Sequence, residues 1–211
     1  MNTGINYTEH WDSVYQTKPD EQLGWFEDYP ETTLKLIEEC HLKSDAVILN
    51  VGVGTTTLID ALLDKGYINI IVNDLSKSAL QKLETRIHKK YNHQLTSIAD
   101  DLTNPKKLLE LKKVDLWIDR AVLHFFLTKE GQDNYFKTLK SVVSKGGYVL
   151  IAVFSLEGAE KCSGLPLQRY NAEMLQDKLG EDFKLIETLN YMYINPSGGE
   201  RPYVYTLFKR Q

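Results

Sequence analysis

Two glycines, Gly52 and Gly54, stand between a short apolar run and a helical pattern. Glycines in such a turn let the backbone bend tightly and approach a ligand, because no Cβ stands in the way. Asp74 ends the next apolar run, where a carboxylate accepts hydrogen bonds from both hydroxyls of a ribose. The pattern predicts a site for a ribose-containing ligand. The structural alternatives are a plain strand-to-helix turn and an Asx turn ahead of Ser76.

Charged side chains follow the next two apolar runs as well. After residue 99 come Asp100, Asp101 and Leu102, which offer a carboxylate for the amino group of an adenine and an apolar side chain for its ring face. Residues 119–124 bring an aspartate, an arginine and a histidine to the same rim beside an apolar wall. A solvated pair of loop acids and a salt-bridged strand end are the alternative interpretations of these two segments.

The elements that position these residues alternate along the chain. Apolar runs typical of buried strands occupy residues 46–51, 68–73, 94–99, 114–119 and 148–154. Helices are expected at 57–65, after Ser76, at about 105–111, along a stripe of Phe136, Leu139, Val142 and Val143, and at 171–179. The last two β-prone stretches, 183–194 and 202–209, are too close for a crossover and should pair as an antiparallel hairpin. We therefore predict an α/β fold with a doubly wound, seven-stranded, mostly parallel sheet.

Composition restricts the partners and the compartment. With 211 residues, 42% of them hydrophobic, the chain is expected to form one domain, residues 1–211. A formal charge of -4 argues against nucleic acid as a partner, and no apolar run approaches the roughly 18 residues that a membrane span needs. Cys40 and Cys162 lie far apart, without other ligands at metal spacing, so we expect no metal site and a cytoplasmic location.

The glycine turn and Asp74 fit both a nicotinamide dinucleotide and S-adenosylmethionine. A dinucleotide fingerprint needs a third glycine where this chain has Thr57, which would crowd the helix start that holds a pyrophosphate. S-Adenosylmethionine has no phosphate to bind. This cofactor, with S-adenosylhomocysteine as its product, is therefore the preferred interpretation.

Several longer segments support a family resemblance. They are the glycine turn, Asp74 and residues 11–15, 18–19, 23–26, 119–126 and 162–166. Together they resemble class I S-adenosylmethionine-dependent methyltransferases, most closely a small bacterial type-12-like group and more loosely some protein-lysine methyltransferases. The resemblance implies a Rossmann-like sheet with an antiparallel C-terminal hairpin. It also implies that residues 1–45 form a lid over the cofactor.

The resemblance also implies a set of site residues. One departure is Asn50, because the family usually has an acid there and an amide contributes no charge opposite the ammonium group of the cofactor. The expected cofactor-binding residues are Trp11, Tyr15, Trp25, Asn50, Gly52, Gly54, Asp74, Leu75, Asp101, Leu102, Asp119 and Arg120. Core packing is the alternative for the aromatic residues, whose faces would otherwise attract a sulfonium.

Candidate catalytic residues are His124, Arg120 and Tyr170. His124 is a possible general base, with a buried structural histidine as the alternative. Tyr170 is a candidate for orienting the acceptor, although capping of the following helix by Asn171 explains part of that segment. Methyl transfer itself needs alignment and desolvation of the acceptor, and no metal.

Four functions remain open at this point. The first is a methyltransferase acting on a small molecule at O, S or N, and the second has a lysine side chain of a protein as the acceptor. An acidic rim would favour the second, and a narrow, lidded pocket would count against it. The third is a non-catalytic S-adenosylmethionine-binding module. A dehydrogenase is fourth, weakened by Thr57. The sequence leaves the oligomeric state open.

Overall fold

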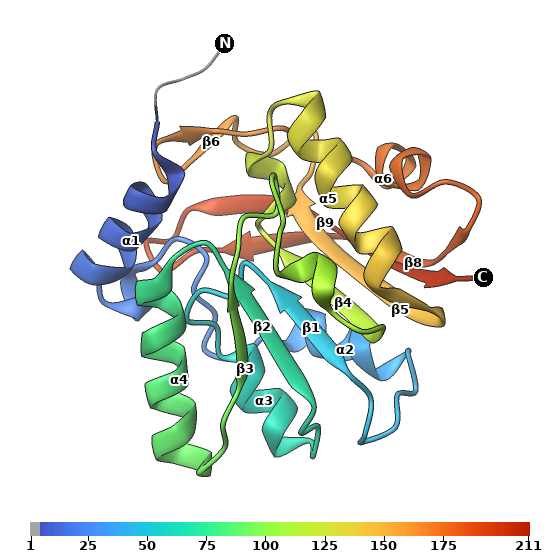
Figure 1. The fold of residues 1–211 in the computed structure, drawn as a ribbon. Coiled ribbons are helices and arrows are strands. Elements are labelled where there is room, and N and C mark those ends of the chain that lie inside the picture. The colour runs from blue at the N-terminus through green and yellow to red at the C-terminus, as the bar shows by residue number, and fades with distance from the viewer. Residues whose placement is uncertain (1–4) are drawn as a thin grey trace.

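The apolar runs of the sequence form a seven-stranded sheet with helices on both faces in the computed structural model, which describes residues 5–211 (Figure 1). The strands of this sheet are β1 (Ile48–Val51), β2 (Ile70–Asp74), β3 (Thr96–Ala99), β4 (Val114–Arg120), β5 (Val143–Phe154), β8 (Phe183–Ile194) and β9 (Glu200–Arg210). The α-helices are α1 (Tyr7–Thr17), α2 (Glu31–Glu38), α3 (Leu58–Asp64), α4 (Lys77–Tyr91), α5 (Lys129–Val142) and α6 (Ala172–Leu179). A small ribbon pairs β6 (Lys161–Cys162) with β7 (Leu165–Pro166).

The strand order is β3-β2-β1-β4-β5-β9-β8. β1 pairs in parallel with both β2 and β4, so the chain winds outward in opposite directions from these central strands. Such a switch point leaves a crevice at the carboxyl ends of the strands. β9 pairs antiparallel with β5 and with β8, which confirms the predicted fold class and its C-terminal hairpin.

Side chains that alternate along the strands build one core on each face of the sheet. Ile48 of β1 packs with α2, α3 and α4, whereas its neighbour Leu49 packs with α5 and α6. Both are fully buried, as parallel strands covered on two faces require. The sheet is therefore held from both sides, and the ends of its central strands are rigid supports for a site.

The helix starts follow the predicted caps, with two departures elsewhere. Ser76 accepts a hydrogen bond from the N–H of Ala79, as expected for the cap of α4. Val143 begins β5 instead of ending the preceding helix, because it pairs with Val114. The helix expected at about 105–111 is only a 3₁₀ turn, Leu108–Glu110. There the carboxylate of Asp100 accepts the N–H groups of residues 106 and 108, which replaces helical hydrogen bonds.

The N-terminal segment lies across the crevice end of the sheet. Val14, Tyr15 and Leu23 form a small buried cluster with Ala79 of α4, and α1 lies beside α4 in Figure 1. Within residues 5–211, no helix is long and apolar enough to cross a membrane. The segment is thus fixed next to the ends of β1, β2 and β4.

Candidate functional site

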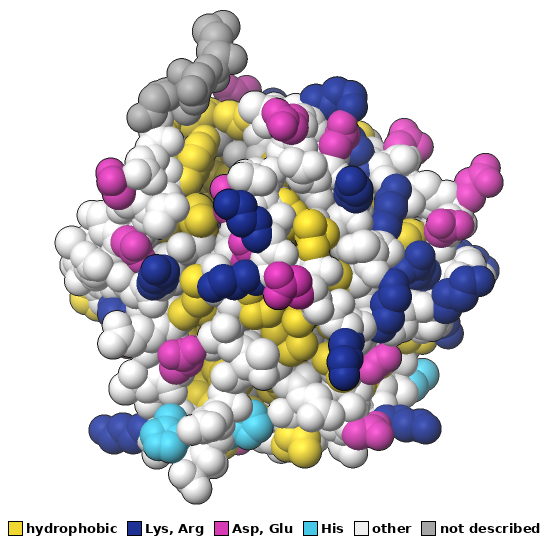
Figure 2. All heavy atoms as spheres, viewed as in Figure 1, with side chains coloured by type: hydrophobic (Ala, Val, Ile, Leu, Met, Phe, Trp, Pro, Cys, Tyr) yellow, Lys and Arg dark blue, Asp and Glu magenta, His cyan; other side chains and the backbone are white. Residues whose placement is uncertain are grey.

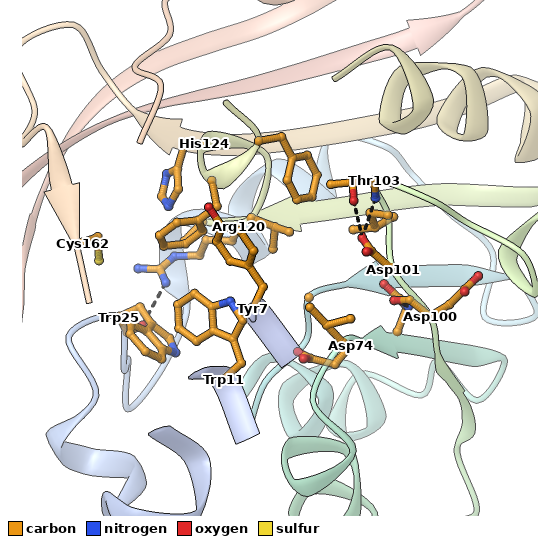
Figure 3. Close-up of a pocket in the computed structure, with 18 of the residues that line it drawn as sticks. Tyr7, Trp11, Trp25, Asp74, Asp100, Asp101, Thr103, Arg120, His124 and Cys162 are labelled. Carbon is orange, nitrogen blue, oxygen red and sulfur yellow. Dashed lines mark hydrogen bonds between the residues drawn. The ribbon is translucent and has the colours of Figure 1, made fainter. Parts of the chain in front are cut away.

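A cavity of about 270 Å³ opens at the carboxyl ends of β1 to β4 (Figure 3). On the surface, hydrophobic side chains show in a hollow beside α1 (Figure 2). Most of the predicted site residues share this one cavity. Its lining consists of Tyr7, Trp11, Tyr15, Trp25, Gly52, Asn73, Asp74, Leu75, Asp100, Asp101, Leu102, Thr103, Arg120, Ala121, Val122, His124, Phe125, Phe126, Leu127, Thr128 and Cys162.

The glycine turn after β1 requires glycine at both positions. Gly52 and Gly54 each have a φ of +52°, a conformation that other residues rarely adopt. A Cβ on Gly52 would lie 2.1 Å from Val122 Cγ2, and one on Gly54 would lie 2.3 Å from the hydroxyl of Tyr15. Packed side chains therefore close in on a bare backbone at the floor of the site.

Asp74, at the end of β2, is held by backbone donors. Its Oδ2 accepts the N–H of Gly54 at 2.7 Å, and its Oδ1 accepts the N–H of Ser76 at 2.8 Å. Burial raises the pKa of Asp74 to about 6, although these hydrogen bonds oppose the shift. A carboxylate offers roughly four lone-pair sites, so capacity remains for the hydroxyls of a ligand.

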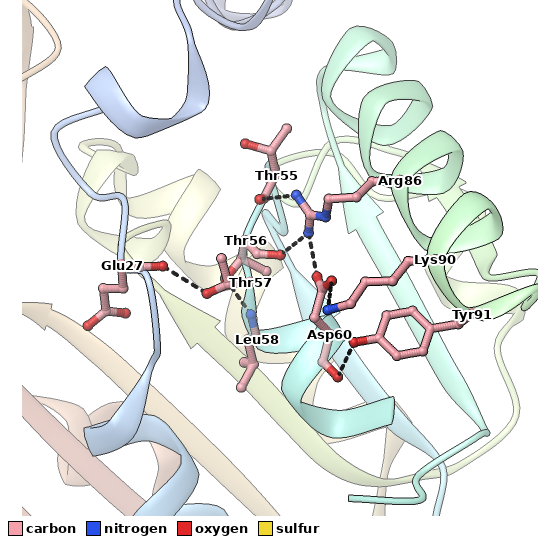
Figure 4. A network of polar contacts seen from close by, with 9 residues as sticks. All are labelled: Glu27, Thr55, Thr56, Thr57, Leu58, Asp60, Arg86, Lys90 and Tyr91. Atoms are coloured by element: carbon pink, nitrogen blue, oxygen red, sulfur yellow. Dashed lines mark hydrogen bonds and ion pairs between the residues drawn. The ribbon is translucent and has the colours of Figure 1, made fainter. Parts of the chain in front are cut away.

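A polar network fixes the other side of the glycine turn (Figure 4). Arg86 of α4 donates to the carbonyl oxygens of Thr55 and Thr56, at 2.8 and 2.5 Å. The same guanidinium pairs with Asp60 of α3 at 2.8 Å, and Lys90 lies 3.2 Å from that carboxylate. The loop between β1 and α3 is thus tied to two helices from outside the cavity.

The segment after β3 contributes acids and an apolar residue to the cavity wall. Asp101 Oδ1 accepts both the N–H and the hydroxyl of Thr103, at 2.8 and 2.7 Å. Within residues 5–211, no hydrogen bond engages Asp101 Oδ2. Leu102 is buried beside it and also lines the cavity. Asp101 and Leu102 thus share the cavity with Asp74, and their contact with an adenine stays a prediction.

Aromatic rings enclose the opposite end of the cavity. Trp11 of α1 meets Trp25 edge to face at 5.6 Å between ring centroids and Phe125 at 5.1 Å. Tyr15 lies 6.1 Å from Trp25 in a similar arrangement. Three of these four rings come from the N-terminal segment, which makes that segment a wall of the cavity.

Arg120, at the end of β4, is held inside this aromatic end. Its Nε lies 3.0 Å from Glu27 and also donates to the hydroxyl of Tyr205, and its Nη1 donates to the carbonyl oxygen of Trp25 at 2.9 Å. Both charged side chains are 13% exposed. Burial raises the pKa of Glu27, and Arg120 partly offsets that rise. The guanidinium also lies over the ring of Tyr193, so the N-terminal segment, β4 and the C-terminal hairpin meet at this residue.

His124 follows in a 3₁₀ turn, Leu123–Phe125, and is fully buried. The N–H of Phe154 donates to its Nδ1 at 3.4 Å. Burial and, to a smaller extent, the charge of Arg120 together lower the pKa of His124 to about 3. A ring with so low a pKa is neutral at physiological pH and is a weak base. These observations favour the buried-histidine alternative over a general base.

Asp119 does not line the cavity, contrary to the prediction that it binds the ligand. It is fully buried, and its oxygens accept the N–H groups of Val122 and Leu123 and the hydroxyl of Tyr135. Burial raises its pKa to about 7. The side chain points into the turn that follows β4, because that turn leaves two backbone donors to satisfy. Asp119 therefore positions residues 120–124 and does not face the cavity.

Comparison with known proteins identifies the domain. Residues 48–147 match the model of a family described as a methyltransferase domain. The chain carries a methyltransferase domain. A solved S-adenosylmethionine-dependent methyltransferase from Anabaena variabilis has the same fold, with a TM-score of 0.75, 13% identity and coverage of 98% of this chain and 96% of that one.

Two further similarities concern proteins with named acceptors. The chain is 26% identical to the EEF1A lysine methyltransferase 2 of Danio rerio. The aligned region covers 68% of this chain and 66% of that relative. The chain also shares the fold of the Burkholderia thailandensis 1,6-didemethyltoxoflavin-N1-methyltransferase, solved with S-adenosylhomocysteine (TM-score 0.68, 15% identity, 97% and 84% coverage). The match to a methyltransferase domain agrees with the predicted class of enzyme, and S-adenosylmethionine stays the predicted cofactor.

Three other predicted residues of the methyltransferase do not line the main cavity, and one of them is Gly54, whose N–H donates to Asp74. Tyr170 is buried in the core beside α5 and α6, so it does not reach an acceptor there. Asn50 lines a smaller adjoining hollow, and its amide donates to the carbonyl oxygens of Val51 and Ile118 at 3.2 and 3.3 Å. Asn50 was expected to face the crevice because it lies near a strand end, and Tyr170 because its loop was expected to close over the acceptor; both side chains point elsewhere.

Some cavity residues of the methyltransferase have no clear sequence signal. Tyr7 and Phe125 line the cavity, but the direction of an aromatic side chain depends on packing and cannot be inferred from its position in the sequence. Glu27 is far from Arg120 in the chain, and nothing in their spacing indicates the ion pair. Thr103 could have been found, because a threonine two residues after an aspartate is a common partner in an Asx turn.

Proposed function

We propose that this enzyme transfers the methyl group of S-adenosylmethionine to a small-molecule acceptor. The observation that supports the proposal most directly is the division of the cavity into two ends. One end holds Asp74 and Asp101, and the other holds Trp25, Arg120 and His124. The second end is covered by residues of the N-terminal segment, which suits a small molecule better than a protein chain.

The residues at the first end fit S-adenosylmethionine. Asp74 retains lone pairs for the two ribose hydroxyls. Asp101 Oδ2 suits the amino group of the adenine, and Leu102 its ring face. Thr57 starts α3 where a dinucleotide would need glycine, and this cofactor has no pyrophosphate. When bound, the cofactor supplies an activated methyl group on a sulfonium.

We also propose that residues 1–45, of which the structure describes 5–45, are the lid of a single domain. Trp11, Tyr15 and Trp25 present aromatic faces to the cavity, which attract a sulfonium by about 0.5–2 kcal/mol. The hydroxyl of Thr57 donates to the carbonyl oxygen of Glu27 at 2.8 Å, so the lid is joined to the start of α3. A lid of this kind excludes water and aligns the acceptor within roughly 3–3.5 Å of the methyl group.

The first test separates the cofactors by calorimetry with S-adenosylmethionine, S-adenosylhomocysteine and NAD. We expect binding of the first two and none of NAD, and preferential binding of NAD would contradict the proposal. The second test measures S-adenosylhomocysteine formed with a panel of small metabolites. Cofactor binding without turnover on any acceptor would instead favour a non-catalytic binding module.

A protein-lysine acceptor is the second candidate. The similarity to the EEF1A lysine methyltransferase 2 of Danio rerio favours it. Incubation of the enzyme with labelled S-adenosylmethionine and a protein extract distinguishes the two candidates. Label on lysine, with none on the metabolite panel, would replace the first candidate with this one.

A cytoplasmic location completes the proposal. Cys40 and Cys162 are both free thiols in the structure, which suits a reducing compartment. Fractionation of cells that express the tagged protein tests the location, and recovery of the protein outside the cytoplasmic fraction would contradict it.

A further inference from the structure

The aromatic end of the cavity holds two buried nitrogen atoms without partners. Among residues 5–211, neither Arg120 Nη2 nor His124 Nε2 has a hydrogen-bond partner. Both side chains line the cavity, and Figure 3 shows them at the end away from Asp74 and Asp101. A buried polar atom without a partner is destabilising, because it has lost its hydrogen bonds to water. Two such atoms at one end of a cavity point to a ligand that satisfies both.

Both atoms are donors. The N–H of Phe154 donates to Nδ1 of His124, so Nδ1 is the unprotonated nitrogen of the neutral ring and the proton lies on Nε2. Every nitrogen of Arg120 carries hydrogen, and its other contacts use Nε and Nη1. The two free positions therefore present N–H groups and no lone pair.

A cationic acceptor does not suit this arrangement. The carboxylate of Glu27, which also reaches this region, is already paired with Nε of Arg120. The thiol of Cys162, nearby, has a pKa raised by burial and stays neutral. An ammonium group would thus meet a guanidinium and an N–H donor, whereas an anion would accept from both.

We propose that Arg120 Nη2 and His124 Nε2 form a subsite for an anionic nucleophile, a thiolate or an oxyanion carried by the small acceptor. This inference rests on the proposed function. The acceptor uses its own lone pair to bond the methyl carbon, and the electron pair of the broken carbon–sulfur bond returns to the sulfur, which becomes a neutral thioether. No proton leaves the acceptor in this step, which agrees with a histidine that is too weak a base to take one.

Three matched probes test the subsite on the full chain: 4-nitrothiophenolate, 4-nitrophenolate and 4-nitrobenzylamine. Calorimetry measures the affinity of each probe for the complex of the protein with S-adenosylhomocysteine, and a coupled assay measures methyl transfer. We expect at least one of the two anions to bind and to react about tenfold better than the amine. The two anions separate sulfur from oxygen as the preferred atom.

Two variants of His124 test the donor itself. His124→Leu removes the N–H and should weaken binding of the preferred anion about tenfold, mainly through KM, while His124→Gln keeps a donor and should retain most of the affinity. Affinity for S-adenosylhomocysteine should stay unchanged in both variants. Equal or better binding of the amine, or equal binding of the anions by wild type and His124→Leu, would overturn the subsite. Failure of wild type to bind S-adenosylmethionine would instead overturn the proposed function.

Discussion

The two ends of the cavity are built in different ways. At the Asp74 end, carboxylate oxygens accept hydrogen bonds from the backbone of Gly54 and Ser76, and the glycine turn is tied down by Arg86. At the Arg120 end, the walls are side chains from distant segments, and two N–H donors have no partner within residues 5–211. The first end thus depends mainly on backbone contacts, whereas the second depends on side chains that meet only in the folded chain. We infer that the first end is built for a constant ligand and that the second determines which acceptor binds.

The largest expected effect concerns the second end and acid stability. The pKa of His124 is lowered to about 3 from an ordinary value of 6.5, so the unfolded state takes up a proton below pH 6.5 and the native state does not. The neutral ring therefore contributes less to the free energy of unfolding as the pH falls from 6.5 towards 3. The loss is about 3 kcal/mol at pH 4.5. We expect the wild type to lose about that much free energy of unfolding relative to His124→Leu between pH 7.5 and 4.5. Urea unfolding at both values measures it, and parallel pH profiles would show that burial does not hold the ring neutral.

The next effect concerns the first end. Asp74→Ala removes both carboxylate oxygens and should weaken binding of S-adenosylhomocysteine by about 1–3 kcal/mol, because charge-assisted hydrogen bonds to the ribose are lost. Calorimetry measures this loss. Asp64→Ala, at the exposed end of α3, is the control and should leave the affinity unchanged. A folded Asp74→Ala variant with wild-type affinity would exclude the ribose role.

The contrast between the two ends also explains how far the sequence could predict the structure. Gly52, Gly54 and Asp74 follow strands with clear apolar patterns, and their functions depend mainly on the backbone, so local sequence locates them. Asp119 stands just as close to a strand end, yet its buried carboxylate accepts hydrogen bonds from the turn that follows β4. Periodicity gives the position of a residue along a strand but does not give the direction of a side chain in the irregular turn that follows it.

At the second end, the sequence did not predict which residues distant in the chain would be in contact. Glu27 and Arg120 are joined only because the N-terminal segment folds over the end of β4. Trp11 and Trp25 were predicted to be cofactor-binding residues. Their edge-to-face arrangement was not predicted, because it arises when the N-terminal segment packs over the sheet. The acceptor therefore has to be inferred from assembled side chains and not from a motif.

A third prediction concerns the charge of the first end. Burial raises the pKa of Asp74 to about 6, so the carboxylate that should bind the ribose is ionised above pH 6 and becomes protonated below it. Between pH 7 and pH 5, affinity for S-adenosylhomocysteine should fall by up to about tenfold, since roughly a tenth of the carboxyl groups are ionised at pH 5. Calorimetry at both pH values tests this, with Asp74→Asn as the variant that should lose the dependence. An equal dependence in wild type and variant would assign it to another group.

The smallest expected effect tests whether the two ends are independent. Arg86→Gln removes the guanidinium donors to the carbonyl oxygens of Thr55 and Thr56, which should loosen the glycine turn. Binding of S-adenosylhomocysteine should then weaken by about 0.5–1.5 kcal/mol. Lys89→Gln, an exposed change on the same helix, is the matched control. Because Arg86 touches neither the N-terminal segment nor Arg120 in the polar contacts of the described chain, the KM for the acceptor should stay at the wild-type value. A parallel rise in that KM would mean that the glycine turn also positions the acceptor, and the division into a cofactor end and an acceptor end would have to be abandoned.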